Sequence, residues 1–128
     1  KAFLFTEFER DLIGILKRKR DEAIAEAIKH CKIRDVDVDG TVYRIAYVIN
    51  DDPNTSIILN TLLTERHDVQ VAVQVMVGIA KVSLRSRDGF PDVADLASKF
   101  GGGGHAGAAG HTFPQSAIEE LLRSIHGG

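Results

Sequence analysis

The sequence has almost no cysteine and little net charge. Its single cysteine, Cys31, excludes an internal disulfide and so a disulfide-bonded secreted domain, and we expect a reducing, cytoplasmic location. There are 16 basic and 18 acidic residues, which give a formal net charge of −2. A charge so close to zero excludes a field over the whole surface that would attract nucleic acid. Any site for a polyanion must therefore be local.

Long apolar runs are also missing. The sequence holds no stretch that would cross a bilayer, and its first segment, KAFLFTEF, is too short and too charged for a signal peptide, so we expect no membrane partner. Hydrophobic residues make up 44% and charged residues 27% of the chain, which is typical of a globular domain. Because Lys1 stands first and Met76 is the one methionine, we expect a piece of a longer polypeptide.

The pattern of apolar residues predicts an α/β fold. Apolar residues recur at helical spacing over residues 8–31. Two β-branched runs, 33–38 and 41–49, flank Asp39-Gly40, a pair typical of a type I′ hairpin turn. The further expected elements are a helix to about Glu65, a strand pair over 69–77 and 79–87, a helix opening at Asp92, a short strand over 111–113 and a closing helix over 116–125. We expect a mixed sheet of about five strands packed with helices, preceded by a long amphipathic helical segment.

Residues 101–110 read GGGGHAGAAG and hold six of the 12 glycines, although glycine is costly to order. One interpretation is a flexible loop that extends a helix C-cap, with Gly101 at the first position after the helix. A dinucleotide fingerprint or a P-loop is excluded, because a helix rather than a strand precedes the glycines and no Walker lysine follows. The other interpretation is a phosphate cradle. In it, bare glycine N–H groups and the N-terminus of a following helix approach an anion, and His105 donates to it.

A strand with three cations precedes this stretch. Alternation places Lys81, Ser83, Arg85 and Arg87 on one face. Three cations on one face are costly to bury unpaired, so they are either solvated, as on a sheet edge that resists aggregation, or opposite an anion. The nearness of the glycine stretch favours the anion, since arginine suits two-pronged contacts with phosphate.

The segment Gly102–Gly110 resembles the GGGHxxAAG signature of the type-one DHH-associated domain, the C-terminal domain of the DHH phosphoesterases. The SLRSR segment, Ser83–Arg87, and the helical pattern of 92–100 are similar to that family's approach to the signature. The resemblance is strong over about residues 68–113. It implies an N-terminal DHH domain that binds two divalent metal ions, with manganese expected, and cleaves a phosphate ester, while the domain seen here holds the substrate.

The resemblance also implies the division of the chain. Residues 1–31 are expected to be the end of a linker and an entry helix, and residues 32–128 the DHH-associated substrate-binding domain. The expected substrate-binding residues are His105, Gly102, Gly103, Gly104, Arg85, Ser86 and Arg87. The sequence has no Asp-His-His motif and no carboxylate–histidine cluster for two metals. We therefore expect no catalytic residue and no cofactor in this chain, which alone is inactive.

The expected partners are a short oligonucleotide or nucleotide phosphoester and the catalytic DHH domain of the same polypeptide. A freed amphipathic first helix also favours a homodimer. The alternative function is a module that binds tRNA without catalysis, like the related end domain of alanyl-tRNA synthetases. His105 argues against that alternative, since the tRNA-binding version departs from the signature there, and so does the small net charge.

Overall fold

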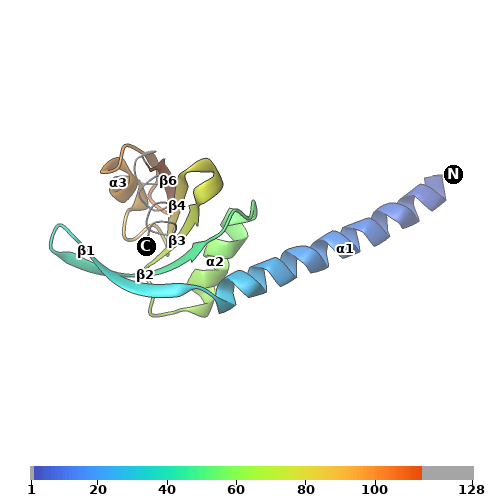
Figure 1. The fold of residues 1–128 in the computed structure, drawn as a ribbon, viewed down its shortest axis with the longest axis horizontal. Helices are drawn as coiled ribbons and strands as arrows, with labels where there is room; N and C mark the ends of the chain where they lie inside the picture. Colours follow the sequence, from blue (N-terminus) through green and yellow to red (C-terminus); the bar gives the residue numbers. More distant parts are fainter. Residues whose placement is uncertain (1, 114–128) are drawn as a thin grey trace, which may run out of the picture.

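The computed structural model describes residues 2–113 of the chain. Its elements, shown in Figure 1, are α1 (Ala2–Lys29), β1 (Lys32–Val38), β2 (Thr41–Ile49), α2 (Thr55–Glu65), β3 (Val71–Met76), the 3-10 turn η1 (Val77–Ile79), β4 (Lys81–Ser86), α3 (Val93–Ser98), β5 (Gly103–His105) and β6 (Ala108–Thr112). The closing helix expected over 116–125 lies outside the described residues.

The six strands form one mixed sheet in the order β1-β2-β3-β4-β6-β5. Only β2 and β3 run parallel, and α2 is the crossover that connects them, while all other neighbours are antiparallel. The expected α/β class and mixed sheet are confirmed. The sixth strand is β5, which the glycine stretch builds where a loop or a helix start was expected.

The β1–β2 hairpin turns at Asp39-Gly40 as the sequence predicts. Both residues have positive φ, 53° and 89°, which is the geometry that a type I′ turn requires. The carboxylate of Asp37 accepts the N–H of Gly40 at 2.8 Å. At the tip of the hairpin, Lys99 Nζ lies 2.6 Å from Asp39 Oδ2, and this ion pair connects the hairpin to the end of α3.

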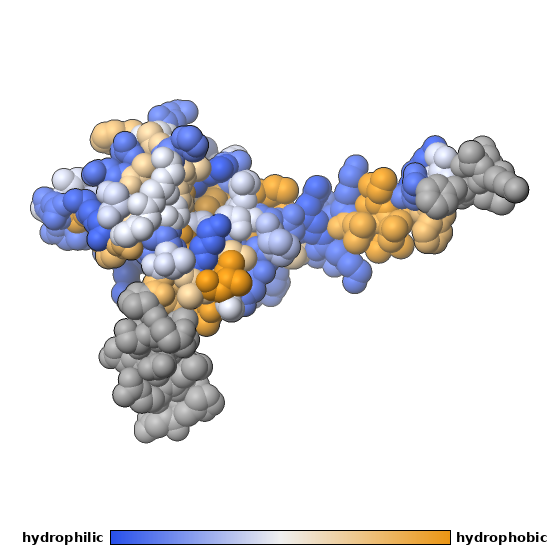
Figure 2. Space-filling model, turned by 90° about the horizontal axis from the view of Figure 1, so that it is seen from above, coloured by the Kyte–Doolittle hydropathy of each residue, from blue (hydrophilic) through white to orange (hydrophobic). Residues whose placement is uncertain are grey.

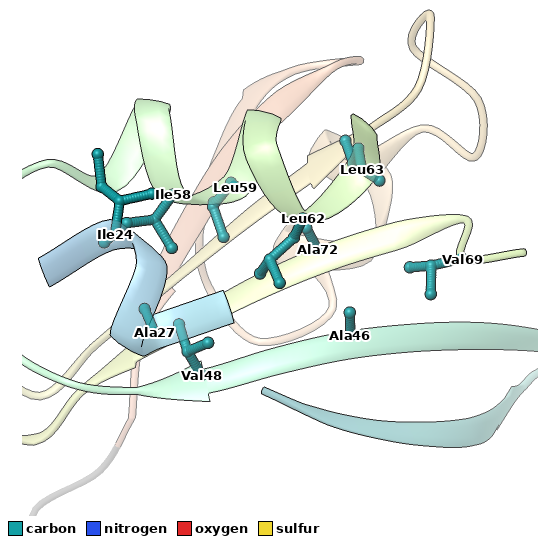
Figure 3. Packing of buried hydrophobic residues seen from close by; sticks show 10 residues of the cluster. All are labelled: Ile24, Ala27, Ala46, Val48, Ile58, Leu59, Leu62, Leu63, Val69 and Ala72. Atoms are coloured by element: carbon teal, nitrogen blue, oxygen red, sulfur yellow. The ribbon is translucent and has the colours of Figure 1, made fainter. Parts of the chain in front are cut away.

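Each face of the sheet buries its own apolar cluster. On one face α2 lays Ile58, Leu59 and Leu62 against the sheet, and α1 reaches this cluster only through its last turns, with Ile24 and Ala27 (Figure 3). On the other face Val71 and Val73 pack against Val93 of α3. Strand β4 contributes Val82 and Leu84 to the second cluster, so its alternate residues Lys81, Ser83 and Arg85 point to the face that carries α2.

The first part of α1 projects from the body of the molecule, away from the β1–β2 hairpin (Figure 1). It carries exposed apolar side chains that give the hydrophobic cluster on the projecting helix in Figure 2: Phe8, Leu12, Ile13, Ile15 and Leu16. Within the described part of the chain, no helix is both long and apolar enough to cross a membrane.

Candidate functional site

Arg85 and His105 lie in one row across the sheet. Arg85 of β4 pairs with Ala108 of β6, and Ala108 pairs in turn with His105 of β5. Directly opposed residues of antiparallel strands point to the same face, which here is the face that α2 covers in part. Neighbouring strands are about 4.8 Å apart, so the two Cα atoms are separated by roughly 10 Å. Only the methyl group of Ala108 stands between the guanidinium-bearing and the imidazole-bearing residue.

The next row of paired residues along these strands has even smaller side chains. Ser83 pairs with Gly110, and Gly110 pairs with Gly103. A Cβ built on Gly103 would meet no atom within 4 Å, so nothing in the fold requires glycine there. The two rows together form a floor of small residues, the small-residue floor (Ser83, Gly103, Ala108 and Gly110), with Arg85 and His105 at its two sides.

Arg85 is held at this floor by one contact with α2. Its Nη1 donates to Asn60 Oδ1 at 2.8 Å. Its side chain is half-buried, and its other N–H groups donate to no residue among 2–113. Asn60 is a positioning residue that the sequence reasoning did not find, because its 25-residue separation from Arg85 carries no local signal. The N–H groups of the guanidinium that do not contact Asn60 are therefore available to an anion.

Arg87 and Ser86, both expected at the site, are engaged elsewhere. Arg87 donates to main-chain carbonyls at and beyond the end of α2, those of Leu63, Arg66, His67 and Val69. Ser86 is buried, points to the α3 face of the sheet, and donates its hydroxyl to the carbonyl of Ala106 at 3.1 Å. These two side chains therefore support the fold around the site.

Gly101, Gly102 and Gly104 are glycines for structural reasons. Gly101 has a φ of 84° and follows α3, where it ends the helix as expected. The N–H of Gly102 donates to Ala97 O at 2.9 Å in the same cap, so this amide is not free for an anion. A Cβ on Gly102 would lie 2.1 Å from the carbonyl of Gly110, and one on Gly104 would lie 2.6 Å from that of Ala108.

The helix start expected behind the glycines is replaced by strand β6. Its Ala108, Ala109 and Gly110 pair with β4 on one side and with β5 on the other. A Cβ on Gly110 would come within 3.0 Å of the carbonyl of Val82, so small residues let β6 lie close between its neighbours. The prediction that the N-terminus of a helix would help to bind an anion behind the glycines is therefore wrong, because a strand follows them.

His105 is exposed on β5, at the edge of the sheet. An edge strand leaves one row of N–H and C=O groups unpaired, which is available to a ligand. No side-chain partner of His105 is present within residues 2–113. His111, in contrast, points to the other face and stacks on Phe100 with ring centroids 5.0 Å apart.

Gln74 fixes the start of α2 beside the site. This side chain is completely buried on β3 and accepts a hydrogen bond from the Thr55 hydroxyl. Its amide donates to Asn50 Oδ1 at 2.6 Å and to Asp52 O at 2.9 Å. The sequence reasoning missed Gln74, although a polar residue within the apolar run 69–77 was a visible signal.

A cavity of about 230 Å³ lies between the start of α2 and the small-residue floor. Its lining includes Thr55 and Ser56 of α2, Lys81, Ser83 and Arg85 of β4, and Ala108 of β6. In the described part of the chain, no group of three or more His, Cys, Asp or Glu residues is placed to hold a metal ion. The residues that the structure describes therefore offer no ligand set that would fit a pair of metal ions.

The chain is 27% identical over 126 residues to oligoribonuclease NrnB of Bacillus subtilis, an alignment that covers 91% of this chain and 28% of the relative. The chain therefore spans little more than a quarter of that protein's length.

Solved structures share the fold. A pGpG-specific phosphodiesterase, PggH, of Vibrio cholerae matches with a TM-score of 0.53 and 16% identity, over 84% of this chain and 38% of that one. An exopolyphosphatase-related protein of Bacteroides fragilis matches with a TM-score of 0.52 and 20% identity, over 82% and 33%. The family model of the DHHA1 domain matches residues 40–127, which is more than half of the chain. The chain thus belongs to the DHHA1 domain family, the accessory domain of DHH phosphoesterases.

Proposed function

We propose that this domain binds the phosphate-bearing end of a short oligonucleotide or a related phosphoester and presents it to a catalytic DHH domain of the same polypeptide. The observation that carries the proposal is the row Arg85–Ala108–His105, in which two donors flank a residue too small to fill the space between them. The names of two relatives, an oligoribonuclease and a pGpG phosphodiesterase, support nucleotide phosphoesters as the substrate class.

Each site residue has a role set by its geometry. Arg85, steadied by Asn60, offers parallel N–H groups to the oxygens of a phosphate. His105 donates from the opposite side, and Gly103 lets the ligand approach the backbone without a side chain in the way. None of these residues is a nucleophile with a neighbouring base, so the domain binds and orients the ester without cleaving it. Cleavage belongs to the DHH domain and its metals, for which manganese remains the expected ion.

The projecting part of α1 supports the DHH domain as the partner. Its exposed apolar side chains, Phe8 and Leu12 among them, lie on a helix that makes its contacts with the body only near its end. Exposed apolar surface of this kind favours association, with the DHH domain as the proposed cover and a homodimer as the arrangement when that domain is missing. A nucleotide substrate and a single free cysteine accord with the cytoplasmic location expected from the sequence.

The test is a titration of the 128-residue chain with a 5′-phosphorylated diadenylate, followed by backbone amide shifts in NMR. We expect shifts at residues 83–85 and 103–108, and about tenfold weaker binding in His105→Ala, the loss of one charge-assisted hydrogen bond. His30→Ala, which removes an exposed histidine that directly follows α1 and pairs with Glu26, is the matched control and should bind like the parent chain.

Three outcomes would contradict the proposal. Turnover of the dinucleotide by this chain with manganese would give it catalytic residues of its own. Tighter binding of folded tRNA than of the dinucleotide would favour the tRNA-binding alternative. A large loss of thermal stability in His105→Ala would mean that the histidine serves the fold.

A further inference from the structure

Phe90 is a large apolar side chain that the fold leaves in solvent. With 75% of its surface exposed, it is the most exposed of the large hydrophobic residues in the described part of the chain. Within that part its ring stacks on no other aromatic ring, whereas the ring of Phe100 stacks on His111. Placing a phenyl ring in water gives up the free energy that its burial would supply. The ring is therefore available to a ligand.

A tight turn fixes the backbone of Phe90. Asp88 and Gly89 have positive φ, 53° and 75°, and they join Arg87 to Phe90 in an antiparallel bridge. In this bridge the N–H of Phe90 donates to Arg87 O at 3.0 Å. The turn lies against the turn between β5 and β6, since a Cβ on Gly89 would lie 3.4 Å from Ala106 Cβ. The exposed ring thus stands on a supported backbone beside the proposed site.

The bridge places the Phe90 side chain on the face of the sheet that carries the site. Directly opposed residues of antiparallel strands point to the same face, so Phe90 points with Arg87, and alternation places Arg85 there too. Phe90 therefore follows the row Arg85–Ala108–His105 by the rise of two residues, which is about 7 Å. The sugar of a nucleotide spans a distance of this size between its phosphate and its base.

The phosphate donors of the site cannot by themselves recognise a nucleotide. In the arrangement proposed above, Arg85 and His105 contact phosphate oxygens, which every phosphoester presents. A nucleobase, in contrast, presents an apolar π-face that stacks on an exposed aromatic side chain. Phe90 offers such a side chain one row away from the donors.

We propose that Phe90 is a stacking platform for the base of the nucleotide whose phosphate lies between Arg85 and His105. The inference rests on the proposed function and names the substrate more narrowly, because the domain then prefers nucleotide phosphoesters to phosphoesters that carry no base. Since every base has a π-face, the platform selects for the presence of a base and not for its identity.

The test compares two ligands that differ in one base, the 5′-phosphorylated diadenylate and the same dinucleotide with an abasic 5′ nucleotide. We expect the 128-residue chain to bind the complete dinucleotide about tenfold more tightly, and this preference to vanish in Phe90→Ala. Phe90→Leu, which keeps an apolar side chain without a ring, should lose most of the preference, and Phe90→Trp should keep it. The matched control is Phe8→Ala, which removes an exposed phenylalanine from the projecting part of α1.

Proton NMR of the bound dinucleotide reads the stack directly. The ring current of Phe90 should move the H2 and H8 resonances of the 5′ adenine upfield with the parent chain and not with Phe90→Leu. A preference for the base that Phe90→Ala retains, or no such preference, overturns the platform. The proposed function stands in either case if His105→Ala weakens both ligands. No binding of either ligand overturns both proposals.

Discussion

Arg85 and Arg87 are two residues apart and on the same face of the chain, yet their side chains have different hydrogen-bond partners and different roles. Arg87 gives its N–H groups to four main-chain carbonyls at the end of α2. Among the residues that the structure describes, Arg85 makes one side-chain hydrogen bond, to Asn60, so its other donors are available to the ligand that we propose. The difference teaches that, of two arginines two residues apart, the one whose donors the fold does not use is the better candidate for binding a ligand.

The glycines divide in the same way. Gly102 and Gly104 are required because β6 passes too close for a side chain, whereas Gly103 faces open space. A run that looks uniform in the sequence thus contains structural glycines and one that the fold leaves free. This free glycine is part of the small-residue floor and lies two residues from His105 on β5, where the proposed ligand would approach the backbone.

The variant with the largest expected effect is Gly102→Ala, which tests whether this glycine is required by the fold. Its Cβ would overlap the carbonyl of Gly110, and backbone cannot move aside as a flexible side chain would. We expect a loss of about 3 kcal/mol in the free energy of unfolding and a fall of roughly 10 °C in melting temperature, measured by circular dichroism. A variant as stable as the parent chain would show that β5 does not pair as described.

Arg87→Ala tests the arginine that the fold uses. Losing these bonds removes the guanidinium from the carbonyl of Leu63 in α2 and from three carbonyls in the turn that follows the helix, which should cost about 2 kcal/mol. Chemical denaturation measures this loss. Dinucleotide affinity of the folded variant should fall less than in Arg85→Ala, and the reverse order would exchange the roles of the two arginines.

Arg85→Ala tests the arginine that the fold leaves free. We expect dinucleotide affinity to fall ten- to a hundredfold in isothermal calorimetry, while the free energy of unfolding changes by less than about 1 kcal/mol. Arg85→Lys should recover only part of the affinity, because an ammonium does not make two parallel bonds. Full recovery by lysine would mean that only the charge matters.

Gly103→Ala tests the free glycine. Its Cβ would meet no atom of the protein within 4 Å, so the free energy of unfolding should stay within about 0.5 kcal/mol of the parent chain. Dinucleotide affinity should fall severalfold, since the methyl group occupies space at the floor. Unchanged affinity would place the ligand elsewhere.

A third arginine gives the smallest effect, because carboxylates satisfy it. Arg44 lies between Asp35 and Asp68, and its hydrogen bond to Asp35 lowers the pKa of that carboxyl below its usual value. The pair therefore stabilises the β1–β2 hairpin above the ordinary pKa of an aspartate and stops doing so as pH falls through the lowered one. The effect is slight because the pair is exposed. Hydrogen exchange of the hairpin at acid pH should show it, and an equal acid response in Asp35→Asn would contradict it.

Local signals predicted most of the fold. The Asp39-Gly40 turn followed from the positive φ that both positions need, and the end of α3 followed from Gly101. Strands β5 and β6 were missed in part, because glycine and alanine carry no strand preference. Those strands form because small residues let them pack closely, and a pattern within one segment cannot show such a contact.

The sequence also predicted part of the candidate site, the shared face of β4, but not the contacts that its side chains make with α2. Alternation along 81–87 placed Lys81, Ser83 and Arg85 on one face, and the structure confirms that placement through the pairing of β4 with β3. The different hydrogen-bond partners of Arg85 and Arg87 depend on where α2 ends above the sheet. The part played by Asn60 depends on the same packing, so neither was visible in the sequence.

Gln74 has a consequence for how reliably the sheet aligns. Its three hydrogen bonds are available only on the α2 face, where Asn50, Asp52 and Thr55 meet. A slip of β3 by one residue would turn Gln74 towards the apolar cluster around Val93 and leave its amide unpaired. The hydrogen bonds of Gln74 therefore lower the free energy of the correct register of β3 relative to registers shifted by one residue. Because β4 pairs with β3, they also determine where the donors of β4 lie.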